Sequence, residues 1–267
     1  MASPDIIKVE EGDSSSSNTN GNSGMCNSSD IVQLVQKVIA EVIGTYFLVF
    51  AGCGSGVVNK IYGSVSFPGI CIVWGLILMV MIYSVGHISG AHFNPAVTIT
   101  FAIFRRFPLK QVPLYIAAQM IGSILASATL CALFPINNKY FFGTTPVGSN
   151  FQALFIEIIT SFLLMFVICG VATDNRAIGE LAGIAVGMTV TLNMFISGPI
   201  SGGSMNPARS IGPALLLRMY KGLWVYIAGP LAGTILGGFA YNMIRLTDKP
   251  LRELTKSGSF LKSMSKK

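Results

Sequence analysis

Apolar residues along this chain gather in long runs that polar and charged residues separate. Six of these runs have roughly the 20 residues that an α-helix needs to cross a bilayer. They lie at about 36–58, 67–86, 110–134, 151–172, 178–197 and 222–245. Two further apolar segments, about 93–104 and 206–217, are too short to span. The pattern predicts an all-α integral membrane protein with six transmembrane helices and two shorter helices.

The two short segments both begin at an Asn-Pro pair. Proline at the first position of a helix is a common start signal, because its missing N–H would have no partner there. Backbone that leaves helical structure at membrane depth is tolerated only where protein or water surrounds it. We therefore expect two re-entrant half-helices, beginning near Asn94 and Asn206, that enter the membrane and return.

The first half of the sequence recurs in the second half. The segment ISGAHFNPA at 88–96 matches ISGGSMNPA at 200–208, and Glu41 has a counterpart in Glu157. The offsets between matching segments lie between 111 and 116 residues. Each repeat holds three spans, an odd number, so the second copy must lie inverted, and inverted repeats place functional elements near the membrane midplane. The repeats cover about 36–134 and 151–245.

Polar segments flank the predicted membrane domain, which covers residues 34–247. Residues 1–33 form an arm rich in Ser, Asn and Gly, which cannot bury a core and is expected to be disordered. Residues 248–267 form a basic tail. The excess of Lys and Arg between spans and in the tail predicts that both termini lie in the cytoplasm.

Composition excludes several classes of protein. With 52% hydrophobic and 11% charged residues, the chain lacks the charge that coats a soluble surface. The net charge of +7 forms no single basic face, so nucleic acid is not an expected partner. Four of the five cysteines fall within apolar runs and give neither a disulfide framework nor a metal signature. No catalytic residue, metal or cofactor is predicted, because no nucleophile–base set, metal cluster or phosphate loop is visible.

The starts of the two half-helices are the first candidate pore elements. Inverted symmetry lets them meet head to head, and each helix N-terminus carries about half a positive charge. Two such ends facing one lumen would repel cations, including protons. Asn94 and Asn206 would cap the helices and offer amide donors to a passing oxygen, although each could also be only a cap. The two motifs comprise Asn94, Pro95, Ala96, Asn206, Pro207 and Ala208.

Three charged residues lie in apolar surroundings, where a charge is expensive and usually functional. Arg209 lies one turn into the second half-helix, where it can face the lumen, donate to a solute oxygen and repel cations. An ion pair with Glu41 or Glu157 is the alternative. The symmetric positions of the two glutamates indicate a shared role, and a proton relay of a coupled carrier is one candidate.

Two stretches, HISGAHFNPAVT at 87–98 and GGSMNPARS at 202–210, resemble the signature loops of the aquaporin family of major intrinsic proteins. CGVATDNRA at 169–177 and TDKPL at 247–251 are similar to the nodulin-26-like intrinsic proteins of plants. This resemblance covers about residues 36–247. It implies an aquaporin-like fold in membrane lipid and a homotetramer with one pore per subunit. It also implies that Glu41 and Glu157 brace the re-entrant loops by accepting hydrogen bonds from their backbone.

The resemblance assigns the narrow selectivity filter to Trp74, Met194, Gly203 and Arg209. Water-specific members carry His where this chain has Met194, so the wall is expected to be more apolar here, and Gly203 is expected to remove bulk from the opposite side. Plant relatives of this type more commonly carry Val and Ala at these two positions. Such a wall favours solutes with a carbon skeleton and a few hydroxyl or amide groups, such as glycerol. Trp74 as an interface anchor and Met194 as a packing residue are the alternatives.

The sequence also predicts roles for two histidines and for one serine of the tail. His87 and His92 are interpreted as pore-loop residues that hold the turn or present carbonyls, with a pH sensor as the alternative. Ser259 in the tail resembles the family's site for a calcium-dependent kinase, and phosphate there would cancel nearby positive charge and change gating or partner binding. A kinase and a cytosolic enzyme are the partners expected at the tail. An unmodified, solvated tail is the alternative.

The sequence thus predicts a passive channel for small uncharged solutes that excludes protons and ions. Glycerol-like polyols and water are the expected cargo, with ammonia and metalloid acids as further candidates. An ion-coupled secondary transporter is the alternative, because it also uses inverted repeats and broken helices. The plasma membrane or an internal membrane, such as that of the symbiosome, is the expected location.

Overall fold

The computed structural model describes residues 28–135, 141–174, 176–177 and 179–245. Six helices in this part are long and apolar enough to cross a membrane, and no strand occurs within it. The predicted all-α fold, six spanning helices with two half-helices, is confirmed. The α-helices are α1 (Ser28–Tyr62), α2 (Ser66–Ser89), α3 (Pro95–Ile103), α4 (Val112–Leu133), α5 (Asn150–Thr173), α6 (Ala182–Ser201), α7 (Pro207–Leu217) and α8 (Val225–Ile244). Short 3-10 turns, Leu109–Gln111 and Gly179–Leu181, lead into α4 and α6.

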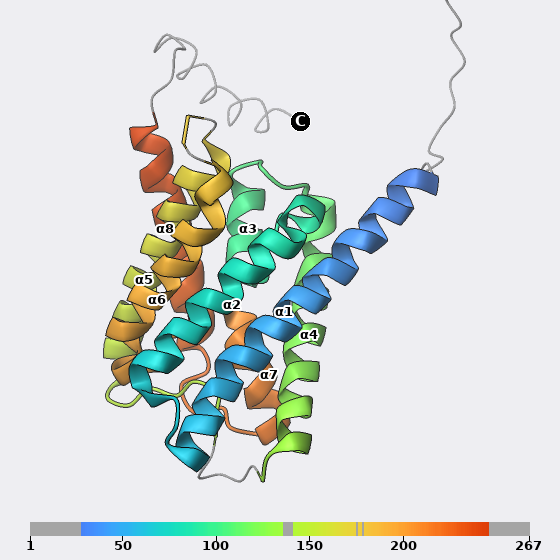
Figure 1. Ribbon diagram of the computed structural model, residues 1–267. Coiled ribbons are helices and arrows are strands. Elements are labelled where there is room, and N and C mark those ends of the chain that lie inside the picture. Colours follow the sequence, from blue (N-terminus) through green and yellow to red (C-terminus); the bar gives the residue numbers. More distant parts are fainter. Residues whose placement is uncertain (1–27, 136–140, 175, 178, 246–267) are drawn as a thin grey trace, which may run out of the picture.

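The long helices surround the two half-helices, which lie in opposite halves of the bundle (Figure 1). α1 packs against α4 and α2, just as α5 packs against α8 and α6. α2 and α6 pack against each other and join the two repeats. The duplicated sequence therefore produces duplicated packing, with α3 and α7 as equivalent elements.

Glycine allows the helices of the two repeats to approach closely. A Cβ atom on Gly75 of α2 would lie 2.5 Å from the carbonyl oxygen of Gly187 of α6, and one on Gly187 would lie 2.6 Å from that of Gly75. Both distances are far below van der Waals contact. The seam between the repeats thus depends on backbone-to-backbone packing, as is common for helices in membranes.

α1 begins at Ser28, so the predicted end of the disordered arm at residue 33 is wrong. Asp30 lies in the first turn, where a negative charge is favourable beside the helix N-terminus. Ile31 and Val32 are both about half exposed, and the first turns of α1 project beyond the bundle (Figure 1). The hydropathy pattern missed this extension because the segment mixes apolar residues with Asp, Gln and Lys.

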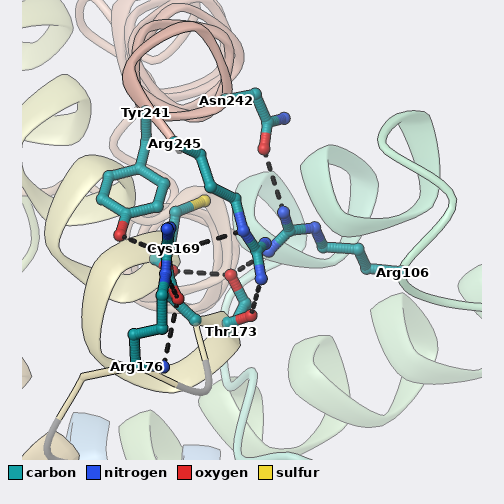
Figure 2. Close-up of polar contacts among 8 residues, drawn as sticks. Arg106, Cys169, Thr173, Arg176, Tyr241, Asn242 and Arg245 are labelled. Atoms are coloured by element: carbon teal, nitrogen blue, oxygen red, sulfur yellow. Dashed lines mark hydrogen bonds and ion pairs between the residues drawn. The ribbon is translucent and has the colours of Figure 1, made fainter. Parts of the chain in front are cut away.

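A polar cluster joins the ends of α5, α8 and the connection after α3. Asp174, which follows α5, accepts two hydrogen bonds from the Arg176 side chain, at 2.9 and 2.7 Å, and one from the Tyr241 hydroxyl at 3.0 Å. Arg245 donates to the carbonyl oxygen of Thr173 at 2.8 Å and lies 3.6 Å from the Asp174 carboxylate. Figure 2 shows the side chains of Arg176, Tyr241 and Arg245 converging from separate elements.

Arg106 extends the same cluster to α3. Its guanidinium donates to the Thr173 hydroxyl and to Asn242 Oδ1, the latter at 2.9 Å (Figure 2). Arg106 follows α3 closely in the chain, whereas Thr173 ends α5 and Asn242 belongs to α8. The cluster therefore ties the outer end of the first half-helix to the second repeat.

Asp174→Asn is expected to lower the Tm by a few degrees at neutral pH, because the substitution removes the negative charge that the arginines and Tyr241 share. Hydrogen bonds from Arg176 hold the pKa of Asp174 well below its usual range. A lowered folded-state pKa stabilises the protein above the ordinary value of 3.8, and this stabilisation is lost as the pH falls below it. Thermal unfolding in detergent should therefore separate the two proteins at pH 7 and bring them together toward pH 2.

Glu180→Gln, at an exposed position in the turn before α6, is the matched control and should not alter the Tm. An equal Tm for wild type and Asp174→Asn at pH 7 would show that the cluster does not stabilise the fold.

Candidate functional site: a pore at the junction of the half-helices

The two half-helices meet at their N-termini. The side-chain amide of Asn94 donates to the carbonyl oxygen of Met205 at 2.7 Å, and that of Asn206 donates to the carbonyl oxygen of Phe93 at 2.8 Å. Each asparagine thus bonds the loop of the other repeat. The head-to-head arrangement expected from inverted symmetry is present, and it brings the partial positive charges of both helix ends together.

The Asn-Pro-Ala sequences start both helices in the same way. Asn94 has an extended backbone, with φ of −151°, and its Oδ1 accepts from the backbone N–H of Ala96 at 2.9 Å. Asn206 has the same φ, and its Oδ1 accepts from Ala208 at 2.9 Å. Pro95 and Pro207 occupy the first helical turn, where a missing N–H costs nothing. Both asparagines therefore cap their helices with the oxygen and keep the amide group for bonds across the junction.

Glu41 of α1 holds the first re-entrant loop. Its Oε1 accepts from the His92 N–H at 2.9 Å and from the Ser89 hydroxyl at 2.8 Å. Its Oε2 accepts from the Phe93 N–H at 2.8 Å. The carboxyl group is fully buried, and these donors offset the cost of removing it from water.

Glu157 of α5 makes the equivalent bonds in the second repeat. Its Oε1 accepts from the Ser201 hydroxyl at 2.6 Å and from the Ser204 N–H at 2.8 Å, while Oε2 accepts from the Met205 N–H at 2.7 Å. Neither glutamate lines the cavity described below. Both carboxylates accept hydrogen bonds from the re-entrant loops, as a bracing role requires. Because they do not line the cavity, they are badly placed for a proton relay.

One cavity runs past the junction and combines the candidate pore residues. Asn94, Asn206 and Arg209 line it, as do Trp74 and His92. Most of the remaining wall is apolar, with Leu78, Ile82, Leu164, Ile168, Val186 and Val190. The cavity thus combines a few polar groups with a largely apolar wall.

Arg209 lines this cavity and carries hydrogen-bond donors that have no partner. The residue is 5% exposed, and its Nη2 donates to the carbonyl oxygen of Gly202 at 3.2 Å. The Nε and Nη1 groups have no hydrogen-bond partner, although they are buried. Within the described ranges no carboxylate lies within ion-pair distance of Arg209, so the alternative of an ion pair with Glu41 or Glu157 does not hold.

Arg209 also breaks the symmetry of the repeats. Val97 occupies the equivalent position in α3, three residues after Asn94, and it also lines the cavity. The charge therefore lies on one side of the junction only. The wall of the cavity therefore carries an arginine on α7 and an apolar valine at the equivalent position of α3.

The four residues assigned to the selectivity filter all line the same cavity. Arg209 Cζ lies 4.8 Å from the centroid of the Trp74 indole, within the range of a cation–π interaction. Trp74 is 5% exposed, so it is not an anchor at the membrane interface. Met194 is 3% exposed and both packs in the core and lines the cavity.

The sequence predicts that Gly203 removes bulk from the side opposite Met194, but the structure shows no such opening. A Cβ atom on Gly203 would lie 2.4 Å from the Met194 sulfur, so the thioether fills the space beside the glycine. The φ of Gly203 is +58°, a backbone conformation that favours glycine. The flexible Met194 side chain occupies the volume that the missing side chain leaves.

The two histidines lie in different environments. His92 is buried, its Nδ1 is 3.1 Å from the Thr98 hydroxyl, and its ring packs against Phe101 and Tyr115. His87, in contrast, lies in the last turn of α2 and is exposed. The interpretation of His87 as a pore-loop residue is wrong, because α2 continues to Ser89 before Gly90 ends it.

Two polar residues that the sequence reasoning missed support the loops. Gln119 of α4 is fully buried and donates to Glu41 at 2.8 Å and to the Thr98 hydroxyl at 2.9 Å. Thr144, between α4 and α5, is 3% exposed and donates to the Ser210 hydroxyl at 2.7 Å. A polar residue inside a predicted span was a usable signal for Gln119. No local pattern marks Thr144.

Ser259 and the tail 248–267 lie outside the described residues, as do residues 1–27 of the arm. The proposed phosphorylation site therefore stays a prediction.

Comparison with known proteins identifies the family of this chain. The family model described as major intrinsic protein matches residues 28–241. A probable NIP-type aquaporin of Nicotiana alata is 68% identical over 260 residues, covering 97% of this chain and 96% of the relative. Nodulin-26 of Glycine max is 61% identical over 232 residues, covering 86% of each chain. The X-ray structure of the aquaglyceroporin from Plasmodium falciparum superposes with a TM-score of 0.72 at 26% identity, covering 79% of this chain and 96% of that one. The chain therefore belongs to the major intrinsic protein family, and it is a passive membrane channel rather than an enzyme.

Proposed function

We propose that this channel conducts small neutral solutes with one or more hydroxyl or amide groups, glycerol above all, together with water. The observation that carries the proposal is the pair of unpartnered Arg209 donors beside the Trp74 indole in an otherwise apolar wall. A hydroxyl oxygen can accept from the guanidinium while the carbon skeleton contacts the indole. The fold similarity to an aquaglyceroporin supports the same class of solute.

Cations would be excluded at two places along this path. Arg209 places a full positive charge in the wall, and the facing N-termini of α3 and α7 add partial positive charges at the junction. Asn94 and Asn206 point their amide groups across the junction, where they also act as donors. A passing water that accepts from these groups cannot continue a chain of proton transfer through the same site.

An ion-coupled transporter has less support from the site. A coupled carrier needs ionisable residues at the substrate path. Glu41 and Glu157 are fully buried and bonded to the loops, away from the cavity lining. Solute uptake that follows an imposed proton or sodium gradient would nevertheless favour the carrier.

Several properties of the assembly belong to the same proposal. We infer a homotetramer, with one pore per subunit, in the plasma membrane or an internal membrane such as that of the symbiosome. Both described chain ends lie at the same end of the bundle (Figure 1), which supports placing both termini on the same side of the membrane. The excess of Lys and Arg supports the cytoplasm as that side. A kinase acting at Ser259 and a cytosolic enzyme are the proposed partners of the tail.

Trp74→Ala tests the proposed filter. Loss of the indole widens the constriction, so we expect the permeability to glycerol and to longer polyols to rise by about tenfold, which corresponds to about 1.4 kcal/mol in the barrier. Water permeability should change much less, since water already fits. Stopped-flow light scattering on proteoliposomes measures both quantities.

Trp224→Ala is the matched control, because Trp224 is the other tryptophan of the chain and is 48% exposed at the start of α8. It should leave the ratio of glycerol to water permeability unchanged. Equal ratios for wild type and Trp74→Ala would show that the constriction lies elsewhere.

A further inference from the structure

We propose that Gly52 of α1 is a specificity-determining position, because its missing side chain provides the slot in which the Trp74 indole lies. The inference rests on the proposed role of Trp74 in the filter. Gly52 itself contacts no solute. It acts through Trp74 and is therefore a positioning residue.

The first observation is the contact between the glycine and the ring. A Cβ atom on Gly52 would lie 2.4 Å from Cδ2, 2.4 Å from Cε2 and 2.5 Å from Cε3 of Trp74. Three ring atoms at nearly equal distance place that Cβ over the face of the indole and not at its edge. A side chain at residue 52 and the present position of the ring therefore exclude each other.

The second observation concerns which of the two groups can move. Gly52 is buried, and its neighbours Val49 and Cys53 are 0% and 2% exposed in the main core cluster. The carbonyl oxygen of Gly52 also accepts from the Ser55 hydroxyl at 2.7 Å. The α1 backbone is thus held by packing on several sides. Close-packed interiors resist such displacement, so the indole has to give way.

The third observation gives the direction of the movement. Trp74 and Arg209 line the cavity, whereas Gly52 is not part of its wall. The indole therefore separates Gly52 from the lumen. In the structure the Arg209 Cζ atom lies 4.8 Å from the centroid of the indole. A side chain at residue 52 would push the ring away from α1 and toward the lumen, and so change its position relative to the guanidinium. Both the width and the polarity of the constriction would change.

The chain provides a matched control one turn further along the same helix. A Cβ atom on Gly56 would meet nothing within 4 Å. Gly52→Ala and Gly56→Ala therefore make the same chemical change with the same effect on helix propensity. They differ in the contact with Trp74, and Gly56 is also less buried than Gly52.

The test compares Gly52→Ala, Gly56→Ala, Trp74→Ala and the double variant Gly52→Ala/Trp74→Ala, each reconstituted in proteoliposomes. We expect Gly52→Ala to lower glycerol permeability by about tenfold, or about 1.4 kcal/mol in the barrier, with a smaller loss for water. Gly56→Ala should match wild type. In the Trp74→Ala background, Gly52→Ala should have no further effect, because the ring that it displaces is gone.

A spectroscopic measurement reports the position of the ring directly. Trp74 becomes the single tryptophan of the chain in a Trp224→Phe background. We expect Gly52→Ala to shift its fluorescence emission and its quenching by acrylamide, and Gly56→Ala to change neither. A glycine needed only for helix packing would leave this signal unchanged.

The outcomes separate the two proposals. If Trp74→Ala alters the solute ratio while Gly52→Ala behaves like Gly56→Ala, the role of Gly52 is refuted and the filter stands. If Trp74→Ala alters nothing, the filter itself is wrong. Should Gly52→Ala fail to fold, recovery of folded protein in the double variant supports the slot. Failure of both to fold contradicts it, since the clash would then involve another group.

Discussion

Arg209→Val is expected to raise proton permeability by about tenfold or more, and to lower glycerol permeability because the guanidinium donors are lost. The substitution removes a full positive charge from the wall of a cavity where screening by water is weak. Valine is also the residue at the equivalent position of α3, Val97, so the two halves of the pore would become alike and the shape should be tolerated. A tenfold change in proton permeability corresponds to only about 1.4 kcal/mol of the permeation barrier, which is well within the effect of one charge.

Proteoliposomes that contain a pH-sensitive dye measure the proton flux, and stopped-flow light scattering measures glycerol. Arg209→Lys is the control, since it keeps the charge but loses the planar fork of donors. It should keep protons out while lowering the glycerol permeability. Proton flux in Arg209→Val that stays at the wild-type level would assign cation exclusion to the helix N-termini alone.

Glu157→Leu is expected to lower the free energy of unfolding by about 3–5 kcal/mol and to reduce the yield of folded channel sharply. The change leaves the N–H groups of Ser204 and Met205 and the hydroxyl of Ser201 without their acceptor. Each buried unpaired donor costs about 1–3 kcal/mol. Thermal unfolding in detergent and size-exclusion chromatography measure the loss.

Two further variants separate bracing from other effects. Glu157→Gln keeps one carbonyl oxygen as an acceptor, so its loss of stability should be smaller. Glu180→Leu places the same leucine at an exposed position and should leave the Tm near the wild-type value. A Glu157→Leu channel as stable as wild type would mean that the second loop holds its shape without the carboxylate.

The hydropathy pattern was sufficient to predict the membrane helices, because hydrocarbon imposes a fixed length of apolar residues on each span. The internal repeat was sufficient to predict the junction, since inversion forces the two Asn-Pro-Ala helices to meet. Arg209 could be recognised for a similar reason, as a charge in an apolar segment has few roles. These predictions depend on constraints that act on every residue of a segment.

Predictions that depended on the volume around one side chain were less successful. Gly203 was expected to open the pore, yet the Met194 sulfur fills that space. Spacing along a helix gives the face on which a residue lies, but it does not say which neighbour occupies a gap. The slot at Gly52 was missed for the same reason, because a glycine within an apolar run carries no signal of the ring that lies against it.

The crossed hydrogen bonds of Asn94 and Asn206 have a consequence for biosynthesis. Met205, whose carbonyl oxygen accepts from Asn94, follows that residue by 111 residues. A ribosome that adds about 5–20 residues per second needs roughly 6–20 s to make this stretch. During that interval the Asn94 amide of the nascent chain lacks this acceptor, so the first short helix is not yet fixed by the bond. The junction between the half-helices is therefore completed only after the second half of the chain has been made.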